Sequence, residues 1–319
     1  MFYKRNFILL FLLLAVSLAF SSELTVSYKN YSARIKYDSV SFPGQAFFVK
    51  MSITPVKEQN INIEASAELF GEKRISKANF YFIKNDEQNN CQLLTGLPMW
   101  SWEKPNPAAK IIIKCSVNGQ QNLIELPVSI EEKQYPHEKI HLNESLSDLV
   151  STPSPEKKEQ SRILNELLQT VNKDAVYEVE GFIRPTDKTR ITSEFGQTRT
   201  FIYNNGKESP SYHAGLDFGI PTGSEVYACG KGKVVMARWR IVTGYSVIIE
   251  HLPGLYSIYY HLSELKCKEG DIVNKGDLVA LSGATGLATG PHLHWEIRMN
   301  TICLDPDSLV KNFSFSDSE

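Results

Sequence analysis

The sequence predicts a mainly β protein with two domains joined by a helical linker. Its 319 residues suit two modest domains rather than one, and a hydrophobic content of 42% is enough to bury real cores. In both halves, short segments rich in β-branched and aromatic residues alternate with Gly, Pro and Asn turns. Between them lies one amphipathic stretch with helical spacing.

Residues 1–21 are typical of a secretory signal peptide. Lys4 and Arg5 precede an apolar run from Phe7 to Phe20, and small residues follow. The run has about 14 residues, whereas a membrane span needs about 20, so an uncleaved anchor is the less favoured alternative. There is no cysteine near the end of the apolar run, so a lipid anchor is not indicated. No later segment is apolar enough to span a bilayer. We therefore expect an exported protein without a stable membrane span after signal cleavage.

Residues 22–132 are expected to form a β-sandwich-like domain. Cys91 and Cys115 are too close in sequence for the inter-sheet disulfide of a true immunoglobulin domain, although they could close a loop of roughly 25 residues. Trp100 and Trp102 are expected to pack inside, with an exposed binding loop as the alternative. The predicted strands are SARIKYDSV (32–40), AFFVKMSI (46–53), NINIEASAELF (60–70), KANFYFIK (77–84), KIIIKCSV (110–117) and NLIELPVSI (122–130).

Residues 133–180 are predicted to be a polar linker that contains one amphipathic helix. Ser154 can cap this helix, with Pro155 at its first position. Its apolar residues recur at helical spacing, which favours docking on a domain over binding a partner. They are Ile163, Leu164, Leu167, Leu168 and Val171.

Residues 181–310 are predicted to form a compact antiparallel sheet domain, followed by a tail at 311–319. EGDIV (269–273) and KGDLV (275–279) form a quasi-repeat in which each Gly-Asp suits a tight turn between short strands. Cys229, Cys267 and Cys303 alternate with core-like residues and are expected to be buried. The formal net charge of -2 argues against a nucleic-acid partner, which would require a basic surface.

This second half also holds a set of residues suited to metal catalysis. His213 and Asp217 are four apart, and His292 and His294 are two apart in GPHLH, a spacing that aims both side chains to one face of a strand. A catalytic zinc needs three protein ligands and an open position. His213, Asp217 and one histidine of the HLH pair could supply them, which leaves the other histidine and His261 for acid/base work.

The same half resembles the lysostaphin-type (LytM-type) zinc endopeptidases of bacterial cell walls. The matching stretches include ITSEFGQTR, YHAGLDFGIPTGSEVYACGKGKVV, YYHLSELKCKEGDIVNKGDLVALSGATG and TGPHLHWEIR, within about residues 182–307. The resemblance implies an enzyme in the periplasm or cell envelope of a bacterium, with one Zn²⁺ per chain. Its substrate would be peptidoglycan peptide, in crosslinks or stems, cut by a zinc-activated water.

The resemblance also implies a role for each matching residue. His213, Asp217 and His294 would bind zinc, and His261 and His292 would act on the water and the transition state. Arg199 in FGQTR would support the fold, and His251 would be structural. These follow from the motifs that this sequence shares with the family.

Two further expectations concern the groove. Tyr259, two residues before His261, shares its predicted strand face and could line the groove, although a packed sheet tyrosine is the plainer interpretation. Glycines near the site fit a groove that admits an extended peptide closely. They are Gly283, Gly286 and Gly290.

Two other functions deserve comparison. A non-catalytic relative that activates other wall hydrolases usually lacks one or more ligands, whereas all five positions are present here. A biotin- or lipoyl-carrier domain would need a lysine at a hairpin tip, and the tip after LVALSG is ATGLATGPH, without lysine. Both are less favoured than the peptidase.

Overall fold

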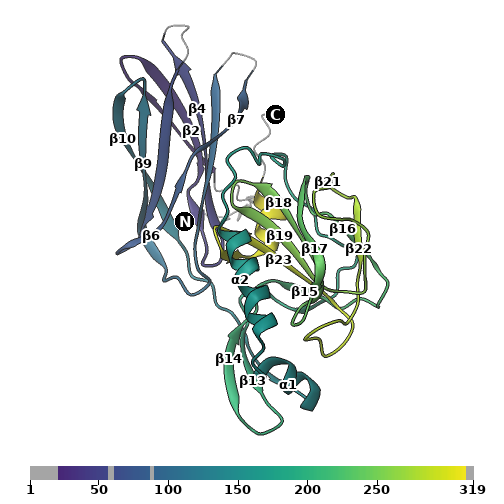
Figure 1. Ribbon diagram of the computed structural model, residues 1–319. Coiled ribbons are helices and arrows are strands. Elements are labelled where there is room, and N and C mark those ends of the chain that lie inside the picture. Colours follow the sequence, from purple (N-terminus) through teal and green to yellow (C-terminus); the bar gives the residue numbers. More distant parts are fainter. Residues whose placement is uncertain (1–20, 57–60, 87–89, 314–319) are drawn as a thin grey trace, which may run out of the picture.

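The computed structural model of the chain describes residues 21–56, 61–86 and 90–313 (Figure 1). The predicted signal peptide falls outside these ranges except for Ser21, and so does the end of the predicted tail. Strands dominate the described part, as expected. No helix within the described ranges is long and apolar enough to cross a bilayer.

The N-terminal part is a sandwich of two five-stranded sheets, with strand orders β1-β2-β4-β8-β7 and β3-β10-β9-β5-β6. Side chains that alternate along the strands form its core, as the period of a half-buried strand requires. Tyr31, Phe47, Leu69 and Ile111 in this core are fully buried. The strands are β1 (Ser21–Ser27), β2 (Tyr31–Asp38), β3 (Val40–Ser41), β4 (Ala46–Pro55), β5 (Ile63–Phe70), β6 (Arg74–Asn79), β7 (Tyr81–Asn85), β8 (Cys91–Pro98), β9 (Asn106–Val117) and β10 (Gln120–Ile130).

The sandwich differs from the sequence prediction at several strands, among them β1, which was not predicted. KANFYFIK is not one strand, because the chain passes at Phe80 from β6 in one sheet to β7 in the other. β8 was not predicted, although it pairs with both β4 and β7. Cys91 on β8 and Cys115 on β9 lie in different sheets and are free thiols, so they close no loop.

The expectation that Trp100 and Trp102 pack inside is also wrong. They lie in the connection between β8 and β9, where their exposed fractions are 36% and 56%. The two rings stack on each other instead of entering the sandwich core.

The linker is more structured than predicted. It contains β11 (His137–His141), α1 (Glu144–Ser151) and α2 (Pro155–Gln169). The predicted start of α2 is confirmed, since the Ser154 side chain accepts a hydrogen bond from Lys157 N and Pro155 is the first helical residue. β11 was not expected; it pairs in parallel with β13 (Thr198–Ile202) in a small sheet that also contains β14 (Glu208–Tyr212).

The apolar stripe of α2 docks on the C-terminal domain, as predicted. Leu164 and Leu168 are buried against the outer face of the large sheet, where they meet Met236, Ile248 and Tyr256. In Figure 1, α2 lies next to the group of strands β17, β18 and β19, whose side chains it contacts. Val171 lies beyond the helix and is 53% exposed, so it takes no part in the stripe.

The large sheet of the C-terminal part has the order β12-β15-β23-β19-β18-β17-β21, with β24 paired to β23. Neighbouring strands run antiparallel throughout. A small sheet, β16-β22-β20, lies beside it. The remaining elements are β12 (Ile191–Ser193), β15 (Leu216–Phe218), β16 (Glu225–Tyr227), β17 (Gly232–Arg240), β18 (Gly244–Leu252), β19 (Leu255–Leu262), β20 (Glu264–Leu265), β21 (Ile272–Val273), β22 (Leu278–Leu281), β23 (Leu293–Met299), β24 (Ile302–Leu304) and α3 (Pro306–Asn312).

The predicted Gly-Asp turns are confirmed. Gly270 and Gly276 both have positive φ, at 94° and 88°, which favours glycine. In each turn the aspartate carboxylate accepts a hydrogen bond from the backbone N three residues earlier, Lys268 N for Asp271 and Asn274 N for Asp277. The two turns lead into β21 and β22.

The docking of α2 generates a test. Replacing Leu168, which is 1% exposed, with alanine leaves a cavity against the sheet and should lower the free energy of unfolding by about 2–5 kcal/mol. The matched control is Val171→Ala on the same segment, which should change it by less than about 0.5 kcal/mol because Val171 is exposed. Chemical denaturation of both variants measures this, and equal small effects would contradict the docked position of α2.

Candidate metal centre and cleft

The strand pairing of the large sheet brings three predicted ligands together. Asp217 on β15 is directly opposite His294 on β23, and side chains at such positions lie in contact. His213 precedes β15 by a short turn, and its backbone N donates to Gln197 O at 2.9 Å. All three side chains are buried, and their ligand atoms lie within 4.8 Å of one another.

The three facing atoms can all serve as metal ligands. His213 Nδ1 donates to Glu194 O at 2.7 Å, so its Nε2 carries the lone pair. His294 Nε2 donates to Glu296 Oε1 at 2.9 Å, and its Nδ1 faces Asp217. The two facing nitrogens lie 3.1 Å apart, and Asp217 Oδ1 lies 3.0 Å from His213 Nε2 and 2.7 Å from His294 Nδ1. Burial alone would lower the pKa of His294, but Asp217 and Glu296 raise it to about 9, so a proton on Nδ1 is shared with Asp217 when no ion is bound. A metal ion would replace that proton, and the residues fit one.

Glu296 supports His294 from behind. It is 3% exposed and also accepts a hydrogen bond from Arg298 Nε at 2.6 Å. Burial would raise the pKa of the Glu296 carboxyl, but the charge of Arg298 and the hydrogen bond from His294 hold that pKa well below its ordinary value. An ionised carboxylate therefore fixes the His294 ring. The sequence analysis missed Glu296, although its spacing of two from His294 places it on the same strand face.

Arg199 has a more direct role than support of the fold. Its Nη2 donates to Asp217 Oδ2 at 3.2 Å, on the carboxylate oxygen that the histidines do not use. On the other side, Glu138 of β11 lies 3.8 Å from Arg199 Nε and directly opposite Arg199 in the strand pairing. The linker strand thus adjoins the candidate metal centre.

The two other predicted histidines lie on the far side of the same centre. His261 Nδ1 donates to Thr285 O at 2.8 Å and His292 Nδ1 donates to Gly290 O at 2.9 Å, so in both rings Nε2 is the free acceptor. The ring centroids are 4.7 Å apart, and His292 Nε2 lies 3.9 Å from Asp217 Oδ1. Burial, followed by the nearby His292 and His294, lowers the pKa of His261 to about 3, so its ring is neutral.

A β-bulge aims His261 into the site. Between Tyr259 and Leu262, two residues of β19 lie opposite the single Ser246 of β18, and His261 has a φ of 59°. The bulge breaks the alternation on which the Tyr259 prediction relied. Tyr259 is fully buried and its hydroxyl accepts from Cys229 N, whereas Tyr260 stacks on His294 with ring centroids 5.6 Å apart.

His251 lies in the core, as expected. It is fully buried, its Nδ1 donates to Lys231 O, and its Nε2 lies 2.7 Å from Ser257 Oγ. Burial lowers the pKa of His251 to about 4, so it stays neutral.

The glycines after β22 differ in role. A Cβ on Gly283 would lie 2.8 Å from His261 O, and one on Gly286 would lie 2.5 Å from Val242 O, so these two allow backbone segments to pack under the site. Their assignment to substrate admission is wrong. Gly290 has open space at its Cβ position and lines the cleft.

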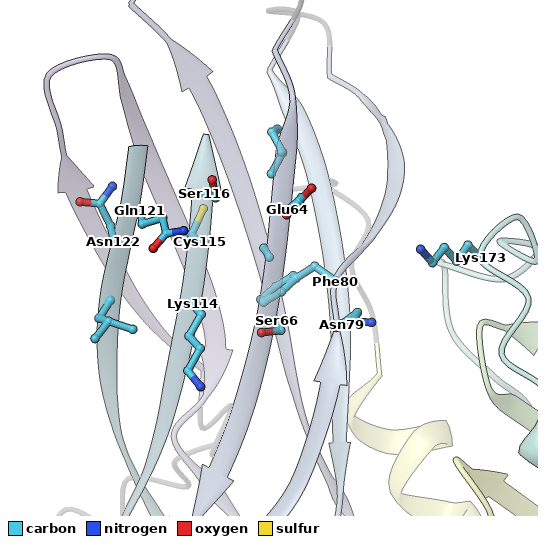
Figure 2. Close-up of a pocket in the computed structure, with 13 residues that line it drawn as sticks. Glu64, Ser66, Asn79, Phe80, Lys114, Cys115, Ser116, Gln121, Asn122 and Lys173 are labelled. Carbon is cyan, nitrogen blue, oxygen red and sulfur yellow. The ribbon is translucent and has the colours of Figure 1, made fainter. Parts of the chain in front are cut away.

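The histidines line an open cleft of about 660 Å³. Its walls also include residues 138–142 of the linker, Tyr212, Val242, Thr243 and Tyr260. A larger hollow of about 820 Å³ lies on the sandwich, over β5, β9 and β10, and Figure 2 shows Lys114 and Gln121 on one side of it and Lys173 on the other. None of the predicted site residues lines that hollow.

The part of the chain that holds these residues is similar to known proteins. Residues 211–306 match Peptidase family M23. The peptidoglycan DD-endopeptidase ShyB of Vibrio cholerae is 41% identical over 115 residues, which cover 35% of this chain and 26% of ShyB. An uncharacterized metalloprotease of Buchnera aphidicola is 35% identical over 122 residues, which cover 38% of this chain and 32% of that protein. The matches thus span about a quarter to a third of these curated relatives.

The whole architecture has a structural counterpart. A crystal structure from Pseudomonas aeruginosa, assigned to peptidase M23, has a TM-score of 0.53 over 80% of this chain and 94% of its own, at 20% identity. This likeness concerns the fold alone, and it extends beyond the matched domain into the N-terminal part. The match over residues 211–306 therefore leads to one conclusion: the C-terminal part of the chain contains a Peptidase family M23 domain.

Proposed function

We propose that this chain is a zinc-dependent endopeptidase that hydrolyses peptide bonds in bacterial peptidoglycan crosslinks or stems. The observation that carries the proposal is the convergence of three possible ligand atoms from His213, Asp217 and His294 in a buried site beside an open cleft. Two imidazole nitrogens and one carboxylate oxygen form a ligand set typical of catalytic zinc. When bound, zinc polarises a carbonyl oxygen and lowers the pKa of a water molecule.

The chain's own residues would then handle the proton and the developing charge. His261 and His292 present free Nε2 acceptors beside the candidate ligands, and either can take a proton from the attacking water. The ring that has taken the proton becomes a donor, which can hydrogen-bond the tetrahedral oxyanion or pass the proton to the leaving amine. Tyr260 stacks on the imidazole ring of His294 and thereby limits the rotation of the His294 ring.

The substrate assignment has two supports. Relatives of the matched domain are named peptidoglycan DD-endopeptidases. The cleft is open and lined by many polar side chains and backbone atoms, which suits an extended peptide better than a small apolar ligand. An N-terminal signal for export would bring the enzyme to this substrate in the periplasm or cell envelope.

Removing a ligand should remove metal and activity together. His294→Ala deletes one of three ligands, and we expect the isolated protein to lose bound zinc and its digestion of purified sacculi. His137→Ala is the matched control, because His137 is exposed and outside the cleft. Elemental analysis and mass spectrometry of the released fragments provide the measurements, and full zinc with full turnover in His294→Ala would refute the ligand assignment.

Removing His261 should separate catalysis from metal binding. His261→Ala leaves all three ligands in place, so zinc content should stay at the wild-type level. Turnover should fall roughly 10²- to 10⁴-fold if the ring acts in proton transfer. Unchanged turnover would exclude His261 from the mechanism, and lost zinc would make it a ligand.

The carboxylate behind His294 should tune metal affinity. Glu296→Gln keeps an acceptor for His294 Nε2 but removes the charge, and metal affinity should fall by roughly 10- to 100-fold. Competition with a chelator of known affinity measures this. An unchanged affinity would show that the hydrogen bond, and not the charge, orients the ring.

A further inference from the structure

Exposed aromatic side chains gather in two clusters beside the candidate cleft. The first cluster consists of Trp100, Trp102 and Tyr212, and the second of Trp239 and Tyr245, with exposed fractions between 36% and 56%. Within the described part of the chain, Phe82 is the only other aromatic residue among the exposed large hydrophobic side chains. Large aromatic surfaces left in water are unfavourable, and when they gather near a site they mark a binding surface.

The first cluster is continuous with the cleft at the candidate ligand His213. The indole rings of Trp100 and Trp102 stack at 4.7 Å with an angle of 13°, and the ring of Trp102 lies 5.3 Å from that of Tyr212. Tyr212 ends β14, lines the cleft, and immediately precedes His213. A loop of the N-terminal sandwich is thereby joined to the entrance of the catalytic domain.

The second cluster adjoins the His261 side. Trp239 on β17 is paired with Tyr245 on β18, and their ring centroids lie 5.0 Å apart in an edge-to-face arrangement. The turn between them supplies Val242 and Thr243 to the cleft wall. Tyr245 N donates to Thr285 Oγ1, and the backbone O of the same Thr285 accepts the hydrogen bond from His261.

We propose that the two clusters bind sugar rings of the glycan strands from which the peptides extend, an inference that rests on the proposed function. A pyranose ring presents a face of C–H groups that stacks on an uncharged aromatic ring. Wall peptides are rich in small and charged groups, which gain little binding energy from stacking on such a ring. Because a crosslink joins two glycan strands, a cleft that cuts it can meet a strand on each side. The first cluster adjoins the cleft wall next to His213, and the second adjoins the turn that supplies Val242 and Thr243 to the wall next to His261.

The test compares substrates with and without sugar. Trp102→Ala and Trp239→Ala should each lower the digestion of intact sacculi several-fold, and by clearly more than they lower the cleavage of a sugar-free crosslinked peptide dimer. Trp102→Phe keeps a ring and should recover part of the loss. Phe82→Ala is the matched control, since Phe82 is 50% exposed on β7 of the sandwich, outside both clusters and the cleft.

A second measurement is independent of hydrolysis. Peptide-free glycan strands, titrated against the chelator-treated full-length protein, should quench its tryptophan fluorescence, and Trp102→Ala and Trp239→Ala should weaken this binding while Phe82→Ala does not. Binding with this pattern supports the proposal even if the protein cleaves no wall peptide. Absence of glycan binding, or equal losses on sacculi and on the sugar-free dimer, would overturn it.

Discussion

The arrangement of the C-terminal domain depends on one constraint, which is that the side chains of His213, Asp217 and His294 converge in a buried position. The pairing of Asp217 with His294 across β15 and β23 brings two of them together. Hydrogen bonds to Glu194 O and Glu296 then orient the rings of His213 and His294, so that His213 Nε2 and His294 Nδ1 face the carboxylate. A buried group of polar atoms is costly unless its members are paired, and the proposed ion would stabilise this arrangement when it binds.

The rest of the chain holds this centre in place from several directions. α2 covers the outer face of the sheet with Leu164 and Leu168, and β11 carries Glu138 to Arg199, the partner of Asp217. The sandwich shares its packing with the C-terminal domain, since Phe48 and Leu94 belong to the same core as Phe182 and Trp295. The N-terminal sandwich is therefore packed on the C-terminal domain. The predicted domain boundary near residue 132 stays a prediction.

Local patterns in the sequence predicted individual caps and turns better than their surroundings. The Ser154–Pro155 cap and the Gly-Asp turns are local, whereas HxxxD and HLH meet only through the pairing of β15 with β23, and the family resemblance brought them together in the prediction. Features that depend on distant partners were missed. The bulge in β19, which places Tyr260 instead of Tyr259 at the cleft, depends on the register of β19 against β18. The parallel pairing of β11 with β13 joins segments about 60 residues apart. Trp102 was expected inside the sandwich, but its partner, Tyr212, belongs to the other half of the chain.

Anomalous diffraction at the zinc absorption edge, from crystals of protein never exposed to chelator, tests the central claim most directly. The account predicts a single strong peak at about 2.0–2.2 Å from His213 Nε2, Asp217 Oδ1 and His294 Nδ1. Neither His261 nor His292 should lie within that distance of the peak. A site without a peak in zinc-supplemented crystals, or an ion bound through His261 or through His213 Nδ1, would contradict it.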